Sequence, residues 1–144
     1  MEKVVCTPWC RGGAAGHDGA VAEECVRVWV VDDQAGFRRA TAATLDATDG
    51  FLMAGECETG EAAVEMISTA EADLVLMDIH MPGIGGIEAT RRLHAAHPGL
   101  TVVLMSTYEL EDLPAAASAC GATGYLKKEL LSPESLSRMW QTAG

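Results

Sequence analysis

The sequence lacks three features that would point to a membrane or secreted protein. No apolar run approaches the ~20 residues of a membrane helix, and the first ten residues, MEKVVCTPWC, lack the continuous apolar stretch of a secretory signal. The five cysteines are an odd number without the spacing of a disulfide framework, which favours reduced thiols. These absences predict a cytoplasmic protein.

Basic residues are also scarce. The chain has 10 Lys and Arg against 21 Asp and Glu, a net charge of −11, whereas a protein that binds nucleic acid usually carries a basic stripe. The basic doublets are spread widely along the chain, at Arg38-Arg39, Arg91-Arg92 and Lys127-Lys128. We therefore expect no direct binding of nucleic acid by this chain.

A change of composition divides the chain near residue 25. Residues 1–25 include the Gly- and Ala-rich stretch CRGGAAGHDGA, which has no hydrophobic period and predicts a flexible N-terminal extension. Its potential metal ligands match no standard zinc spacing; they are Cys6, Cys10, His17 and Cys25. Residues 26–144 have a regular hydrophobic pattern and the length of one domain.

Five predicted strands alternate with five predicted helices in this domain. The strands lie at 26–32, 51–57, 73–78, 100–106 and 123–126, and the helices around 37–45, 63–67, 87–96, 115–120 and 136–140. Three of the strands are apolar throughout, which is typical of parallel strands covered on both faces. The alternation therefore predicts an α/β fold with a doubly wound, five-stranded parallel sheet, in which ligands bind at the carboxyl ends of the strands.

Polar residues stand where four of these strands end. They are Asp32-Asp33, Asp78, Ser106-Thr107 and Lys127-Lys128. Clustered carboxylates raise one another's pKa unless a positive charge lies among them, and Mg²⁺ favours oxygen ligands. A carboxylate can also attack phosphorus while a metal, a lysine and a hydroxyl stabilise the phosphoryl oxygens. The strand ends therefore predict a magnesium-dependent site for phosphoryl transfer.

Four motifs resemble those of bacterial two-component response regulator receiver domains. They are VWVVDD (28–33), LVLMDIHMPGIGGIEATRRL (74–93), VVLMSTYE (102–109) and GYLKK (124–128). The residues of these motifs are most similar to those of the nitrate-response regulator subfamily, whose members usually carry a C-terminal helix-turn-helix. We expect no helix-turn-helix within this chain. The resemblance implies a flavodoxin-like (β/α)5 fold with strand order 2-1-3-4-5.

The resemblance also assigns roles to individual residues. It implies Asp78 as the phospho-acceptor, Asp33 as the main acidic ligand of Mg²⁺, and Asp32 as a ligand that acts directly or through water. The backbone carbonyl of His80 completes the protein's share of the metal shell. Lys128 rather than Lys127 falls at the family's lysine. Ser106 and Tyr125 take the places of the switch hydroxyl and the switch aromatic.

The implied function is that of a phosphoacceptor in a two-component phosphorelay. A sensor histidine kinase or phosphotransfer protein supplies the phosphoryl group, and the chain catalyses only its own phosphorylation and dephosphorylation. The charge of the phosphoryl group shifts the conformation of one face of the domain, formed by residues 115–120, 123–126 and 136–140. This face binds a partner or a second copy. We expect no contact with a membrane.

Other interpretations remain open at this point. The chain could be the receiver portion of a DNA-binding regulator, or a pseudo-receiver that binds partners without phosphate. Asp32-Asp33 could instead cap the following helix, and the glycines of MPGIGG lack the spacing of a nucleotide-binding loop. Gly85 departs from the polar residue usual in relatives, and with Gly83 and Gly86 it predicts an unusually free loop.

Overall fold

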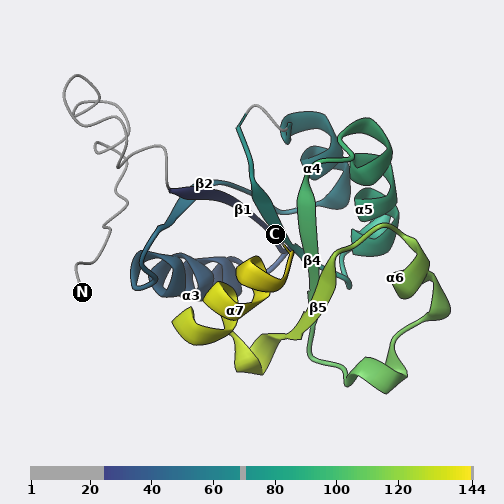
Figure 1. The fold of residues 1–144 in the computed structure, drawn as a ribbon. Helices are drawn as coiled ribbons and strands as arrows, with labels where there is room; N and C mark the ends of the chain where they lie inside the picture. Colours follow the sequence, from purple (N-terminus) through teal and green to yellow (C-terminus); the bar gives the residue numbers. More distant parts are fainter. Residues whose placement is uncertain (1–24, 69–70, 144) are drawn as a thin grey trace.

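The computed structural model describes residues 25–68 and 71–143, which form a five-stranded parallel sheet between two layers of helices (Figure 1). The sheet contains β1 (Val26–Val31), β2 (Phe51–Cys57), β3 (Leu74–Asp78), β4 (Thr101–Ser106) and β5 (Gly124–Lys127). Its order is β2-β1-β3-β4-β5, so the predicted fold class and strand order are confirmed.

Five α-helices connect and cover the strands in the described ranges. They are α3 (Ala35–Asp46), α4 (Gly60–Met66), α5 (Gly85–Ala96), α6 (Ala115–Ala119) and α7 (Pro133–Ala143), with short 3-10 turns η1 (Leu110–Asp112) and η2 (Lys128–Leu130). At the start of α7, the Ser132 hydroxyl accepts a hydrogen bond from the Ser135 N–H at 3.1 Å, and the Ser135 hydroxyl accepts one from the Ser132 N–H. This cap fixes the start of α7 at Pro133, one turn before the range 136–140 predicted from the sequence.

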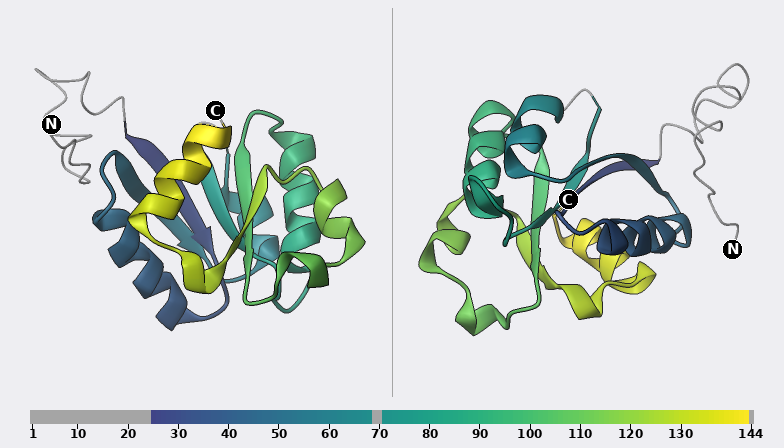
Figure 2. Two further views of the ribbon diagram at one scale, coloured as in Figure 1. Left: turned by 60° about the horizontal axis from the view of Figure 1, so that its bottom comes forward. Right: turned by 180° about the vertical axis from the view of Figure 1, so that it is seen from behind.

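Two apolar clusters hold the helices to opposite faces of the sheet. Alternate strand residues such as Val75 and Leu104 pack with α4, α5 and α6, whereas their neighbours, such as Leu76 and Val103, pack with α3 and α7. Figure 2 shows α3 and α7 together on one face of the sheet. Because both faces are covered, a strand such as β3 is buried along its whole length, which explains its unbroken apolar run.

A register shift between β1 and β2 makes room for a large side chain. Val28 pairs with Met53 and Trp29 with Gly55, so Ala54 is the extra residue of a bulge. A Cβ at Gly55 would lie 2.6 Å from the Trp29 ring. Gly55 is therefore required by the indole packed against it.

The N-terminal part of the chain bears on two expectations, the flexible extension and the reduced thiols. Residues 1–24, including Cys6, Cys10 and His17, lie outside the described residues, so the predicted extension is not tested. Cys25 is disulfide-bonded, and the expectation of reduced thiols is wrong at this position. Sequence spacing does not show which cysteines approach each other in space. Cys57 and Cys120 are free and buried.

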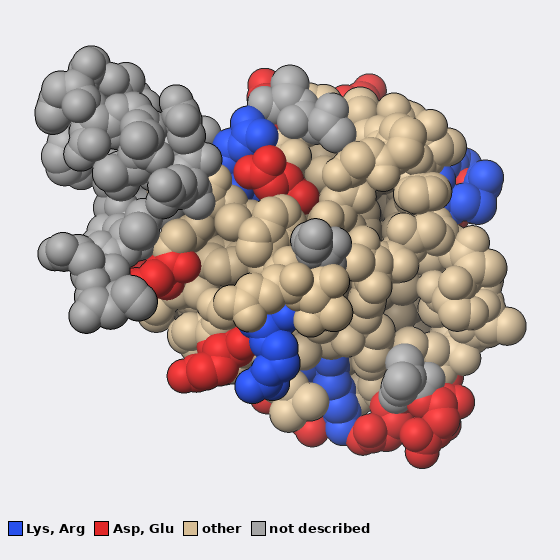
Figure 3. Space-filling view, in the orientation of Figure 1, with Lys and Arg blue, Asp and Glu red and all other residues tan. Residues whose placement is uncertain are grey.

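Several charged groups on the surface lie in pairs of opposite sign. Arg27 pairs with Asp73, Arg38 with Glu56, and both Arg91 and Arg92 pair with Glu88. On the face drawn in Figure 3, the basic groups form no continuous stripe. Within residues 25–68 and 71–143, no helix has the length and apolar character needed to cross a bilayer.

Candidate functional site

Three carboxylates converge at the carboxyl ends of the strands. Asp32 and Asp33 follow β1, and Asp78 is the last residue of the neighbouring strand β3. One carboxylate oxygen from each lies within 4.8 Å of the others. Asp32 and Asp78 are almost fully buried, whereas Asp33 is exposed. The structure thus brings together the three acidic residues predicted from the sequence.

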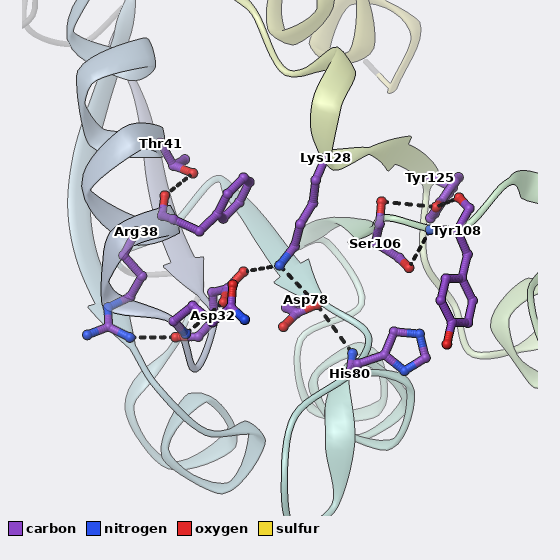
Figure 4. Close-up of polar contacts among 11 residues, drawn as sticks. Asp32, Arg38, Thr41, Asp78, His80, Ser106, Tyr108, Tyr125 and Lys128 are labelled. Carbon is purple, nitrogen blue, oxygen red and sulfur yellow. Dashed lines mark hydrogen bonds and ion pairs between the residues drawn. The ribbon is translucent and has the colours of Figure 1, made fainter.

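Lys128 supplies the positive charge inside this cluster (Figure 4). Its Nζ lies 2.7 Å from Asp32 Oδ2 and 3.5 Å from Asp78 Oδ1. The preceding residue, Lys127, points elsewhere and pairs with Glu109 and Glu129. The two adjacent lysines therefore have different surroundings, and it is Lys128 that reaches the carboxylates.

Backbone and arginine contacts hold the first acidic residue in place. Asp32 Oδ1 accepts a hydrogen bond from the Gln34 N–H at 2.8 Å, while the Asp32 carbonyl accepts one from Arg38 Nη1 at 2.6 Å. Arg38 also reaches Glu56 at the end of β2. Gln34, rather than either aspartate, is the N-cap residue of α3. The alternative interpretation, in which Asp32-Asp33 cap this helix, is therefore wrong.

The environment of Asp78 favours its neutral form. Burial raises the pKa of this carboxyl above its usual 3.8, and the nearby charge of Asp32 raises it further. Lys128 and the His80 N–H, which donates to Asp78 Oδ1 at 3.3 Å, lower the pKa by less. The ionised carboxylate is thus held at a cost to the fold, as is common at functional sites.

Asp78→Asn is therefore expected to stabilise the metal-free protein at pH 7. Because the pKa of Asp78 is higher in the folded than in the unfolded chain, ionisation destabilises the fold above the folded-state pKa. The penalty disappears as pH falls below the unfolded value near 3.8, where both states are protonated. Thermal unfolding should show a Tm higher by a few degrees at pH 7 and a difference that shrinks towards pH 4. An equal or lower Tm for the variant at pH 7 would contradict this account.

The predicted switch residues are joined through the backbone of the loop after β4. Ser106 is buried, and its Oγ accepts a hydrogen bond from the Tyr108 N–H at 3.0 Å. The Tyr125 hydroxyl donates to the Ser106 carbonyl at 3.2 Å and also contacts the Tyr108 carbonyl. Ser106 and Tyr125 therefore both contact the backbone of the loop after β4 (Figure 4). A change at the Ser106 hydroxyl would reach Tyr125 through that loop.

Two of the carboxylates, Asp33 and Asp78, open with Lys128 onto a hollow of about 400 Å³. Besides Asp33, Asp78 and Lys128, the residues that line it are Gln34, Phe37, His80, Thr107 and Glu129. The His80 and Tyr108 rings contact each other beside it, with centroids 4.6 Å apart. Phe37 was not predicted as a site residue from the sequence, where its only signal is its place one helical turn after Asp33.

The loop after β3 is packed rather than free. Gly83 and Gly85 have positive φ of 83° and 79°, and the Ile84 N–H donates to Glu61 of α4 at 3.2 Å. A Cβ at Gly83 would lie 2.3 Å from the same carboxylate, and one at Gly86 only 2.0 Å from the Asp78 carbonyl. The expectation of an unusually free loop is corrected, since these glycines serve turns and close contacts.

Comparison with known proteins places this geometry in one family. The family described as response regulator receiver domain matches residues 28–140. The response regulator GacA of Pseudomonas viridiflava is 39% identical over 103 residues, covering 72% of this chain and 48% of that protein. UvrY of Escherichia coli (strain K12) is 36% identical over 112 residues, covering 78% and 51%.

Solved structures agree with these matches. The receiver domain of the putative response regulator NarL from Mycobacterium tuberculosis is 29% identical, with a TM-score of 0.74, over 83% of this chain and 97% of that one. The response regulator ChrA, from a heme-sensing two-component system, is 32% identical with a TM-score of 0.69, over 83% and 57%. The chain spans about half the length of the curated relatives that it matches.

Proposed function

Because the chain belongs to the response regulator receiver family, we propose that Asp78 accepts a phosphoryl group from a phosphohistidine. The donor is a sensor histidine kinase or a phosphotransfer protein. The observation that carries the proposal is the position of Asp78, which lies at the end of the central strand β3 with two carboxylates and one lysine around it.

The transfer needs one nucleophilic oxygen and groups that accept the charge of the phosphoryl group. A carboxylate oxygen of Asp78 attacks phosphorus, the P–N bond of the phosphohistidine breaks, and the released imidazole keeps the electron pair and takes up a proton. Lys128 stabilises a phosphoryl oxygen, and Ser106 is the hydroxyl that binds another. The buried setting strengthens these interactions.

The donor set fits Mg²⁺. Asp32, Asp33 and Asp78 present only oxygen atoms, which a hard divalent cation prefers, and the His80 carbonyl is the fourth oxygen that we assign to it. When bound, the cation neutralises charge on the phosphoryl oxygens. Without it, Lys128 is the positive group that contacts Asp32 and Asp78, which keeps the cluster compatible with folding.

In this proposal, a conformational change links the site to the face formed by α6, β5 and α7. Tyr125 connects the two, because its hydroxyl binds the loop after Ser106 and its ring lines a hollow beside α6. This hollow is lined largely by apolar groups, among them Leu113, Pro114 and Ala117. We propose that phosphorylation changes this face and that a partner protein or a second copy binds it.

A second candidate is that the chain is the receiver portion of a DNA-binding regulator. The matched relatives GacA and UvrY are about twice as long as the aligned segment. Under this proposal, output belongs to a segment outside this chain. In both cases phosphoryl transfer to Asp78 is the same, and we keep the cytoplasm as the expected location.

The direct test is the intact mass of the protein after incubation with Mg²⁺ and acetyl phosphate. Wild type should gain one phosphoryl group, and Asp78→Asn should gain none. Asp46→Asn, at the exposed end of α3, is the matched control and should behave like wild type. An undiminished adduct on Asp78→Asn would disprove the assignment of the acceptor.

Self-association is tested on the same samples. If the face of α6, β5 and α7 pairs with a second copy, the phosphorylated protein should elute earlier in size-exclusion chromatography than the unphosphorylated one. An unchanged monomer volume would favour binding to a different partner.

A further inference from the structure

The ammonium group of Lys128 has an aromatic neighbour as well as two carboxylates. Its Nζ lies over the Phe37 ring, 4.4 Å from the ring centroid. This distance is within the range of a cation–π interaction, in which the negative face of the ring attracts a positive charge. The Lys128 side chain is only 12% exposed, so water screens this attraction weakly.

Phe37 is partly buried and packs between the core and the hollow at the site. It lies in the first turn of α3, packs against the apolar cluster between the sheet and α3 and α7, and lines the hollow at the site. The hydroxyl of the buried Thr41 donates to the Phe37 carbonyl at 2.8 Å. Asp32 follows β1, and Phe37 lies in α3, the next helix along the chain, so one continuous segment supplies both residues.

We propose that Phe37 is a positioning residue for Lys128 in phosphoryl transfer, an inference that rests on the proposed function. In the structure, Lys128 contacts Asp32 at 2.7 Å and Asp78 at the longer 3.5 Å. A lysine held only by Asp32 would lose that partner whenever the carboxylate serves a metal ion. The ring attracts the ammonium without offering a metal ligand, so it keeps the lysine beside Asp78.

A core-filling role would explain the packing of Phe37 but not the place of the ammonium over its ring. The two roles differ in which substitutions are tolerated. Packing depends on apolar volume, which leucine largely keeps, whereas attraction of a cation depends on an aromatic face. The chain contains one other phenylalanine, Phe51, which is buried in the same cluster at the opposite ends of the strands.

The test compares initial rates of phosphorylation by acetyl phosphate at fixed Mg²⁺. Phe37→Leu should lower the rate about fivefold, and Phe37→Tyr should keep it within about twofold of wild type. The matched control Phe51→Leu removes the same ring from the same cluster and should leave the rate unchanged, although it lowers stability. Equal rates for wild type and Phe37→Leu, or equal losses in both leucine variants, would overturn the proposal.

A second measurement separates this inference from the proposed function. The ring should shift the NMR signals of the Lys128 ε-methylene protons upfield, and the shift should disappear in Phe37→Leu but persist in Phe51→Leu. Loss of the signal in Lys128→Arg assigns it. If wild type accepted no phosphoryl group, the proposed function would be wrong. The chemical shift of the Lys128 ε-methylene protons would still test whether the lysine contacts the Phe37 ring. An ε-methylene shift that is the same in wild type and Phe37→Leu would show that the lysine does not lie over the ring.

Discussion

Gly86→Ala should destabilise the fold by about 3 kcal/mol, more than substitution of any other glycine between β3 and the first turn of α5. An added Cβ would lie 2.0 Å from the Asp78 carbonyl oxygen and 2.8 Å from the Asp78 carbonyl carbon. Both are backbone atoms of the central strand, so no side-chain rotation relieves the contact. The start of α5 or the end of β3 must move. The free energy of unfolding in urea measures the cost.

Two other glycines provide graded controls. At Gly85, φ is +79° but the nearest atom to an added Cβ is 3.7 Å away, so alanine should cost about 1 kcal/mol from backbone strain alone. At Gly36, inside α3, nothing lies within 4 Å, and alanine should stabilise the helix by roughly 0.5–1 kcal/mol. A Gly86→Ala protein as stable as wild type would contradict the close packing at the carboxyl end of β3.

The positive φ at Gly85 is compatible with the polar residue that the resemblance leads us to expect at this position in relatives. Asp and Asn are the residues other than glycine that best tolerate positive φ. A relative with a polar residue there can therefore adopt the conformation that Gly85 has here. The departure changes the cost of the turn rather than the path of the loop, which Glu61 and Gly86 fix from two sides.

Lys128→Ala should have the second large effect, on both stability and phosphorylation. Without the lysine, the buried carboxylates of Asp32 and Asp78 lose the positive partner that they have among the described residues, which should cost about 3 kcal/mol in the absence of metal. Mg²⁺ should recover part of this loss, because it binds the folded site. The rate of phosphorylation by acetyl phosphate should fall about a hundredfold, since one stabilising group is missing.

Lys127→Ala is the matched control, one residue away. Lys127 pairs with Glu109 and Glu129, whose side chains are exposed, so its removal should cost less than about 1 kcal/mol. Its phosphorylation rate should stay near that of wild type. Equal effects of the two substitutions on rate or on stability would contradict the assignment of Lys128 to the site.

Much of the fold could be predicted because its signals are local. The buried run ending at Asp78 marks a central parallel strand, and the alternation of strands and helices gives the layers. The residues at the strand ends meet because parallel strands share one carboxyl edge. Asp32, Asp78 and Lys128 therefore lie together in space, although Asp78 is 46 positions after Asp32 and 50 positions before Lys128 in the sequence.

Other features depend on contacts between segments, which a sequence pattern does not contain. The packing of Trp29 on Gly55 requires a bulge in β2, and the contact of Glu61 with Ile84 joins α4 to the loop before α5. The ring of Phe37 meets Lys128 because α3, which follows β1, and η2, which follows β5, both begin at the carboxyl edge of the sheet. Each of these side chains looks like an ordinary core or surface residue until the sheet is assembled.

The most direct test of the central claim is chemical mapping of the phosphorylated carboxylate. The protein is phosphorylated with acetyl phosphate and Mg²⁺, the aspartyl phosphate is reduced with borohydride, and the reduced residue is located by peptide sequencing in a mass spectrometer. Our account predicts reduction at Asp78 alone, in the presence of Mg²⁺ and not in the presence of a chelator. Reduction at Asp32 or Asp33, or none on wild type, would contradict it.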